Sequence, residues 1–299
     1  MNKAIFFTIC FFICTPTWAK LNVVTSTSDL AALVAQIGDD KVSVSSLTKG
    51  TRDPHYAQAK PSMIRKVFRA DLLIIIGAEM EVGWLPALLR ASRNSKVAIG
   101  QLGYLDVSDY IELKGKSLEP VSRDMGDVHA AGNPHYWLDP SLGLVMAKAI
   151  AERLSQLDTD NKEFYQESFA QFKKELEEKI IHWKAELKHL HGEKIIAYHT
   201  SLLYLADAFN FNIRGYVEPK PGLSPSPSHL KQLIKTIRAE KISYLLMEPY
   251  YEVRSAQLLQ RKSNIKYVII PQSVGANPNV NSYFDLFDNI VAALKSVEK

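Results

Sequence analysis

A long stretch without helix-breaking residues separates the two halves of this chain. From Asp160 to His189 there is no proline or glycine, and apolar or aromatic side chains recur at steps of three and four residues. That period predicts one amphipathic helix, which at about 1.5 Å per residue would extend over roughly 45 Å. Because no flexible linker accompanies it, we expect a rigid helix along both halves rather than a surface or coiled-coil arm.

Strands and helices alternate on both sides of this helix. The segments that read as strands are 21–25, 42–44, 70–77, 96–99, 194–198, 242–247 and 267–270. Helices are expected at 28–37, capped by Ser28, and at 61–68, 84–91 and 283–297. The apolar run 70–77 is typical of a parallel strand buried on both faces. The sequence therefore predicts an α/β fold with parallel sheets in two lobes, residues 20–159 and 191–299, joined by the linking helix 160–190.

The N-terminus has the pattern of a secretory signal peptide over residues 1–19. Lys3 supplies a positive charge, residues 4–14 are apolar, and Thr17 and Ala19 occupy the small-residue positions that signal peptidase reads. The apolar run is shorter than the roughly 20 residues that a membrane span needs. We expect cleavage after Ala19 and a periplasmic protein that begins at Lys20.

Cysteine usage and charge exclude several classes of site and partner. Cys10 and Cys14 both lie in the segment to be removed, so the mature chain has neither disulfides nor thiolate ligands. A lipid on Cys14 is disfavoured because Ile13 before it is bulky for a lipoprotein signal. The net charge of +4, or about +3 without Lys3, comes with no dense basic run. This balance gives no reason to expect nucleic acid as a partner.

Three of the 8 histidines stand where an α/β sheet gathers its ligands. His55 and His135 each follow a proline just before an expected helix, and His199 closes the strand 194–198. Loops at the carboxyl ends of parallel strands are the usual place for a binding site. By spacing alone the three are dispersed candidate metal ligands. For the others we expect surface or structural roles, at the end of the long helix, at a helix start or in the polar loop 114–134: His182, His189, His191, His229 and His129.

The motifs around these histidines occur in the order of one known family. They are Asp53-Pro54-His55-Tyr56 with Pro61-Ser62, residues 76–79 (Ile-Gly-x-Glu), Asn133 to Pro140, Tyr198-His199, and Glu218 to Gly222. From Leu21 to the C-terminus, the chain resembles the zinc- and manganese-binding periplasmic solute-binding proteins of ABC importers (cluster A-I). The resemblance implies two α/β lobes with the metal in the cleft between them, bound by His55, His135 and His199.

The sequence departs from that family at the fourth ligand and in one loop. Gln272 stands where many members carry an aspartate, which leaves water, Gln272 or Glu248 as the fourth ligand. The loop 114–134 contains only His129, so we expect no strong auxiliary collector of zinc there. Three imidazoles suit Zn²⁺ better than the harder Mn²⁺. Manganese members of the family typically replace the third histidine by glutamate. We therefore expect Zn²⁺ as the transported ligand, with Mn²⁺ or another divalent metal as the alternative.

The function implied by the resemblance is binding and delivery, not catalysis. We expect a monomer that delivers zinc to the membrane permease of an ABC importer, with a periplasmic metallochaperone as a further partner. One rival is a zinc-dependent hydrolase, since three histidines and an open position can activate water. No general acid–base motif such as His-Glu-x-x-His accompanies them. A metal-dependent adhesin is a second rival, because it would share the same site.

Overall fold

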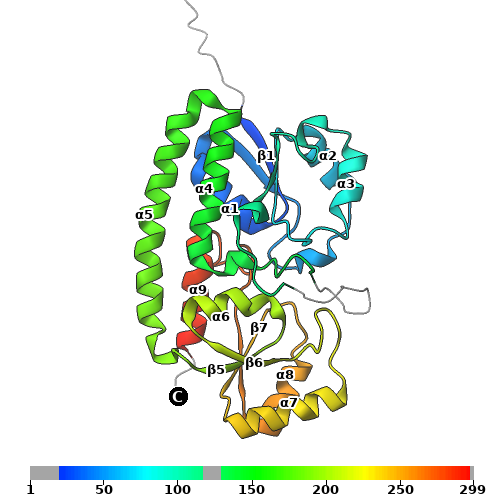
Figure 1. The fold of residues 1–299 in the computed structure, drawn as a ribbon, viewed down its shortest axis with the longest axis vertical. Coiled ribbons are helices and arrows are strands. Elements are labelled where there is room, and N and C mark those ends of the chain that lie inside the picture. The colour runs from blue at the N-terminus through cyan, green and yellow to red at the C-terminus, as the bar shows by residue number, and fades with distance from the viewer. Residues whose placement is uncertain (1–19, 117–128, 297–299) are drawn as a thin grey trace, which may run out of the picture.

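Two parallel sheets of four strands each form the centres of two lobes (Figure 1). The computed structural model describes residues 20–116 and 129–296, so the expected signal peptide lies outside the described residues. The first sheet has the order β2 (Val42–Ser46), β1 (Leu21–Thr25), β3 (Leu72–Ile75), β4 (Tyr104–Asp106). The second has the order β6 (Asn212–Tyr216), β5 (Lys194–Ala197), β7 (Tyr244–Met247), β8 (Lys266–Ile269). The predicted α/β fold with two parallel sheets is confirmed.

Helices cover both faces of each sheet, which explains the continuous apolar runs in the central strands. In β3, Leu72 and Ile74 face one core while Leu73 and Ile75 face another, and all four are buried. The outer helices are α2 (Pro61–Arg69) and α3 (Leu85–Ser92) on the first lobe, and α7 (Pro227–Glu240) and α8 (Arg254–Ser263) on the second. Successive side chains of one strand are therefore buried on opposite faces of the sheet.

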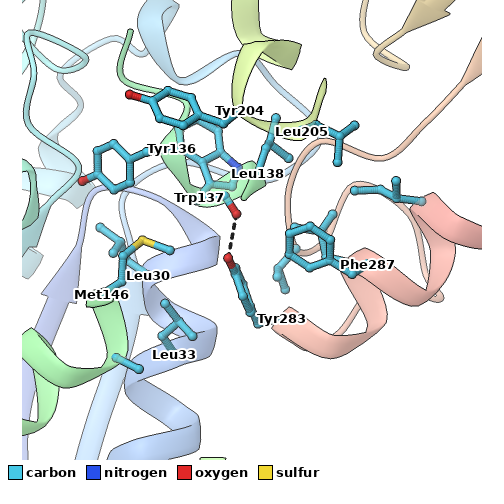
Figure 2. Close-up of a cluster of buried hydrophobic side chains, with 14 of the residues drawn as sticks. Leu30, Leu33, Tyr136, Trp137, Leu138, Met146, Tyr204, Leu205, Tyr283 and Phe287 are labelled. Atoms are coloured by element: carbon cyan, nitrogen blue, oxygen red, sulfur yellow. Dashed lines mark hydrogen bonds between the residues drawn. The ribbon is translucent and has the colours of Figure 1, made fainter. Parts of the chain in front are cut away.

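The inner faces of both sheets share one apolar core. It is built by α1 (Ser28–Gly38), α4 (Pro140–Leu157), α6 (Leu203–Phe209) and α9 (Tyr283–Lys295). Figure 2 shows its centre, where the Tyr283 hydroxyl donates a hydrogen bond of 2.7 Å to the carbonyl oxygen of Trp137. The Trp137 indole N–H in turn donates to the carbonyl oxygen of Gln272 at 2.9 Å. These contacts join the two lobes without an intervening solvent layer.

The predicted long helix is α5 (Lys162–Glu186), which runs along both lobes in Figure 1. It packs beside α4, and near its C-terminal end it is held to α9. Asp288 of α9 accepts hydrogen bonds from the Lys179 ammonium group at 2.8 Å and from the Trp183 indole N–H at 2.7 Å. Contacts at both ends fix α5 as a brace between the lobes.

Two local predictions were wrong. The segment 96–99 is not a strand, because Ser95–Val97 form a 3-10 helix and Ile99 is 74% exposed. The fourth strand of that sheet is β4, an edge strand in which only Leu105 is buried. The N-cap of α1 is Thr27 rather than Ser28. The Ser28 hydroxyl instead donates to the carbonyl oxygen of Val274 at 2.6 Å, which adds another contact between the lobes.

Within residues 20–116 and 129–296, no helix has the length and apolar character needed to cross a membrane.

Candidate metal site

The three candidate histidines come together between the two sheets. His55 lies in the 3-10 helix η2 (Pro54–Tyr56), His135 directly precedes η6 (Tyr136–Leu138), and His199 lies two residues beyond β5. The ring centres of His55 and His135 are 5.1 Å apart, those of His135 and His199 are 5.4 Å apart, and those of His55 and His199 are 6.3 Å apart. All three side chains are largely buried, with exposed fractions of 6%, 2% and 4%. The fold therefore brings together side chains that are far apart in the sequence.

The first two histidines are held by the same local device. In Asp53-Pro54-His55, one oxygen of Asp53 accepts from the backbone N–H of His55 at 3.0 Å and contacts its Nδ1 at 2.7 Å. In Asn133-Pro134-His135, the Asn133 Oδ1 makes the matching contacts, at 2.9 Å with the His135 backbone N–H and 3.0 Å with Nδ1. The intervening proline fixes the backbone between acceptor and ring. An oxygen two residues before the histidine thus sets the orientation of each imidazole.

His199 is oriented by an acceptor from farther along the chain. The Glu218 carboxylate, which follows β6, lies 2.7 Å from Nδ1 of His199 and is 9% exposed. The same carboxylate oxygen accepts from the backbone N–H of Gly222 at 3.1 Å, which holds it in place. In the sequence, Glu218 is visible only as part of the motif Glu218 to Gly222, and nothing there indicates its contact with His199.

The three acceptors determine which ring nitrogen is available to a ligand. A carboxylate and an amide oxygen only accept hydrogen bonds, so each Nδ1 must carry the hydrogen. In the neutral ring each Nε2 then keeps its lone pair, which is the electron pair that a metal ion would use. This arrangement selects one tautomer for His55, His135 and His199 alike.

The charge environment differs between the rings. Burial and the charges of neighbouring histidines hold the pKa of His135 well below its usual value. Burial also opposes protonation of His199. There, the hydrogen bond to Glu218 and the carboxylates of Glu248 and Asp53 outweigh the burial and raise the pKa. The site thus has one ring that strongly resists a proton and one that lies among carboxylates.

Ring spacing shows how far the cluster is from a closed metal site. On a tetrahedral zinc ion with Zn–N bonds of about 2.0–2.1 Å, imidazole centres would lie about 5 Å apart. Two of the three observed spacings are close to that value, while His55 and His199 are roughly one ångström too far apart. Accordingly, among residues 20–116 and 129–296 no three His, Cys, Asp or Glu side chains already form a complete ligand group. Moving the rings of His55 and His199 about one ångström closer together would give all three pairs the spacing expected around a zinc ion.

A fourth imidazole, that of His129, reaches the same cluster. Its Nε2 lies 3.0 Å from Nε2 of His55, and the two ring centres are 5.1 Å apart. The expectation of a surface or structural role for His129 did not foresee this contact. Much of the loop, residues 117–128, lies outside the described residues. The signal that could have revealed His129 is its place six residues before His135, at the described end of that loop.

Two other candidates for a fourth ligand lie buried on the second lobe. Glu248 is fully buried, and its Oε1 accepts from the Ser201 hydroxyl. Its Oε2 has no hydrogen-bond partner within the described residues. Burial raises the pKa of Glu248 to about 7, although the charge of His199 and the Ser201 hydroxyl act in the opposite direction. Gln272 is 1% exposed, and its side-chain oxygen accepts from the Tyr250 hydroxyl.

A cavity of about 880 Å³ borders the histidine cluster. Its walls come from both lobes, since Asp53 and Tyr56 of the first lobe line it together with Tyr250 and Tyr251 of the second. The ring centre of Tyr251 lies 6.1 Å from that of His199. The cavity therefore lies between the lobes and is lined by Asp53, which contacts His55, and by Tyr251, which lies near His199.

Comparison with known proteins identifies relatives over nearly the whole chain. The model of the family ZnuA, described as "Zinc-uptake complex component A periplasmic", matches residues 23–297. The metal ABC transporter substrate-binding lipoprotein ScbA of Streptococcus cristatus is 28% identical over 255 residues, covering 83% of this chain and 78% of ScbA. The manganese ABC transporter substrate-binding lipoprotein PsaA of Streptococcus pneumoniae is 25% identical over 256 residues, covering 84% and 79%.

Solved structures show the same fold. A crystal structure of ZnuA superposes with a TM-score of 0.73 at 24% identity, covering 93% of this chain and 98% of that one. A manganese-bound mutant of a periplasmic metal-binding protein from Candidatus Liberibacter asiaticus gives 0.76 at 21% identity, covering 93% and 99%. The match of the family model to residues 23–297 decides the relationship: the chain belongs to the ZnuA family, the substrate-binding components of metal ABC importers, which are binding proteins and not enzymes.

Proposed function

We propose that this protein captures Zn²⁺ outside the cytoplasm through His55, His135 and His199 and delivers it to the permease of an ABC importer. One observation carries the proposal. Each of the three converging imidazoles has its Nδ1 on an oxygen acceptor, at 2.7, 3.0 and 2.7 Å, so that in the neutral rings each Nε2 keeps the lone pair that an ion would use. A surface cluster of histidines would have no reason to share one tautomer.

The donor atoms favour zinc over manganese. Three neutral imidazole nitrogens match a borderline ion such as Zn²⁺, whereas Mn²⁺ binds better where carboxylate oxygens predominate. The carboxylates of Asp53 and Glu218 contact ring nitrogens here. They are therefore engaged as acceptors for the ligands rather than as ligands themselves.

Manganese is the second candidate, and one residue favours it. The Oε2 of buried Glu248 has no hydrogen-bond partner in the described part of the chain, and its charge acts on His199. A carboxylate that joined the three imidazoles would make the site harder. Relatives such as PsaA of Streptococcus pneumoniae are named for manganese.

A competition experiment separates the two metals. Protein freed of metal by refolding in a chelator is exposed to equal concentrations of Zn²⁺ and Mn²⁺, and its metal content is measured by mass spectrometry. We expect one equivalent of zinc and little manganese. His55→Ala, His135→Ala and His199→Ala should each weaken zinc binding by orders of magnitude, while the exposed control His182→Ala should not. Preferential retention of manganese would support the second candidate, and parental zinc affinity in a variant would remove that histidine from the site.

Delivery to a permease is tested in cells. A strain that lacks this protein should grow poorly when zinc is chelated, and the parent gene should restore growth while His199→Ala should not. Mass spectrometry of the exported protein should show Lys20 as its first residue. A lipid on Cys14 would instead indicate an anchored form, and the relatives ScbA and PsaA are named as lipoproteins.

A further inference from the structure

The contact between His129 and His55 is made by the atom that a metal would bind. The Nδ1 of His55 lies 2.7 Å from an Asp53 oxygen and carries the ring hydrogen. In the neutral ring, the Nε2 of His55 therefore carries a lone pair. At a separation of 3.0 Å, the Nε2–H of His129 must donate to that lone pair. A side chain 74 residues away therefore occupies the ligand position of His55.

The spacing of these two nitrogens is close to that of two ligands on one ion. Zn–N bonds of about 2.0–2.1 Å at a tetrahedral angle place two nitrogens roughly 3.3 Å apart. The observed 3.0 Å between the two Nε2 atoms differs from this by a few tenths of an ångström. The 5.1 Å between the ring centres equals the spacing of His55 and His135. An ion between the two rings would need little movement of either.

The backbone beside His129 is fixed to the first lobe. The N–H of Ala130 donates to the Glu79 carboxylate at 2.7 Å, and the N–H of Gly132 donates to the carbonyl oxygen of His129 at 3.2 Å. Asn133, four residues after His129, already orients His135. His129 is thus tied to the same short segment that supplies a ligand of the proposed site.

Of the side-chain oxygens that could compete for the fourth position, only Oε2 of Glu248 has no hydrogen-bond partner within the described residues. The side-chain oxygen of Gln272, the only atom of that amide suited to a cation, accepts from the Tyr250 hydroxyl. One oxygen of Glu248 accepts from Ser201, and only the other is available. An imidazole is also a better zinc donor than a neutral amide.

We propose that His129 supplies a fourth imidazole to the zinc site, bound through Nε2 beside His55, His135 and His199. The inference rests on the proposed zinc-binding function and names one more ligand of that site. Binding moves the hydrogen of the His129 ring from Nε2 to Nδ1, with no net change in its protonation. Four neutral nitrogens make the site poorer for manganese, so His129 also acts in metal selection.

X-ray absorption at the zinc edge tests the ligand count directly. The zinc-loaded parent protein and the control His191→Ala should show four nitrogen ligands of imidazole type, and His129→Ala should show three with one oxygen. Zinc affinity, measured by competition with a chelator, should fall by at least about tenfold in His129→Ala, because even outer partners of metal ligands account for 10- to 100-fold. His129→Asp should narrow the preference for zinc over manganese.

The results distinguish a failure of the His129 proposal from a failure of the proposed zinc binding. Three imidazoles and one oxygen in the parent, or unchanged affinity and spectrum in His129→Ala, would overturn the role of His129 while leaving the proposed function intact. A parent protein that binds no zinc would remove both. The control His191→Ala deletes an exposed imidazole near the end of α5 and accounts for any general effect of losing a histidine.

Discussion

The carboxylate of Glu218 lies 2.7 Å from Nδ1 of His199 and couples the end of β6 to the end of β5. This contact fixes the tautomer of His199 and increases the electron density at Nε2. We expect Glu218→Ala to weaken zinc binding by about 10- to 100-fold, the usual effect of removing such a partner. Glu218→Gln should lose less, because an amide oxygen can still accept. Chelator competition measures both, and Glu240→Ala, which removes a half-buried carboxylate that pairs with Arg214 and Lys194, is the control.

The two Asx-Pro-His segments allow a matched comparison of stability. The amide of Asn133 donates to the carbonyl oxygen of Thr200 at 2.8 Å as well as accepting from His135. Asn133→Asp removes that donor and places a buried carboxylate against a carbonyl oxygen, so we expect a loss of about 1–3 kcal/mol in the metal-free protein. Urea unfolding gives the value.

Asp53→Asn is the reciprocal change. One oxygen of Asp53 accepts both of its hydrogen bonds from His55, and an asparagine oxygen can accept the same two. The free energy of unfolding should therefore change much less than in Asn133→Asp. Equal losses in the two variants would mean that the contact with Thr200 does not stabilise the protein.

Asp29 predicts how stability depends on pH. Burial raises the pKa of Asp29 from 3.8 to about 7, although the backbone N–H of Val274 and the Ser273 hydroxyl lower it. The folded protein therefore holds a proton that the unfolded chain releases near pH 4. Stability from this group is complete below pH 4 and is lost as the pH rises to about 7, at about 1.4 kcal/mol per pH unit.

Asp29→Asn isolates this contribution. Its side-chain oxygen can still accept from the N–H of Val274, but the group no longer titrates. The difference in unfolding free energy between parent and variant, measured in urea from pH 4 to 8, should shift in favour of the variant as the pH rises. A difference that is constant across this range would show that Asp29 does not carry the extra proton.

The backbone at Gly50 lies close to the backbone of Val274 in the other lobe. A Cβ built there would lie 2.0 Å from the carbonyl oxygen of Val274, which a backbone atom can avoid only by moving. We expect Gly50→Ala to cost about 1–3 kcal/mol and to lower the thermal midpoint. Gly83→Ala is the control, because the nearest atom to its Cβ would be 3.9 Å away. Similar losses at both positions would argue against close contact at Gly50.

The sequence predicts those features whose cause is local. Residues 72–75 were recognisable as a strand because burial on both faces leaves an uninterrupted apolar run. His55 and His135 are recognisable as candidate ligands because a proline, which restricts the backbone, precedes each of them at the start of a helical turn. Strand β4 was missed because an edge position buries only Leu105 and so leaves a weak pattern.

The features that escaped prediction depend on contacts between distant segments. His129 contacts His55, 74 residues earlier, and the neighbouring N–H of Ala130 donates to Glu79, 51 residues earlier. Glu218 meets His199 across neighbouring parallel strands, and no spacing rule indicates which acidic residue will do so. Such pairings are determined by the folded chain as a whole, so a motif can mark one partner but not both.

The single core beneath the two lobes has a consequence for the loaded and empty forms. Opening the lobes by a large angle would expose the apolar side chains around Trp137 and Tyr283 to water. This exposure would cost a free energy of about 25 cal/mol for each Å² of apolar surface. Zinc binding should therefore leave the radius of gyration in small-angle scattering unchanged, while hydrogen exchange slows only in the segments that carry the histidines. A transporter that accepts the loaded protein would then have to distinguish it by the mobility of a few surface loops, since its outline is the same.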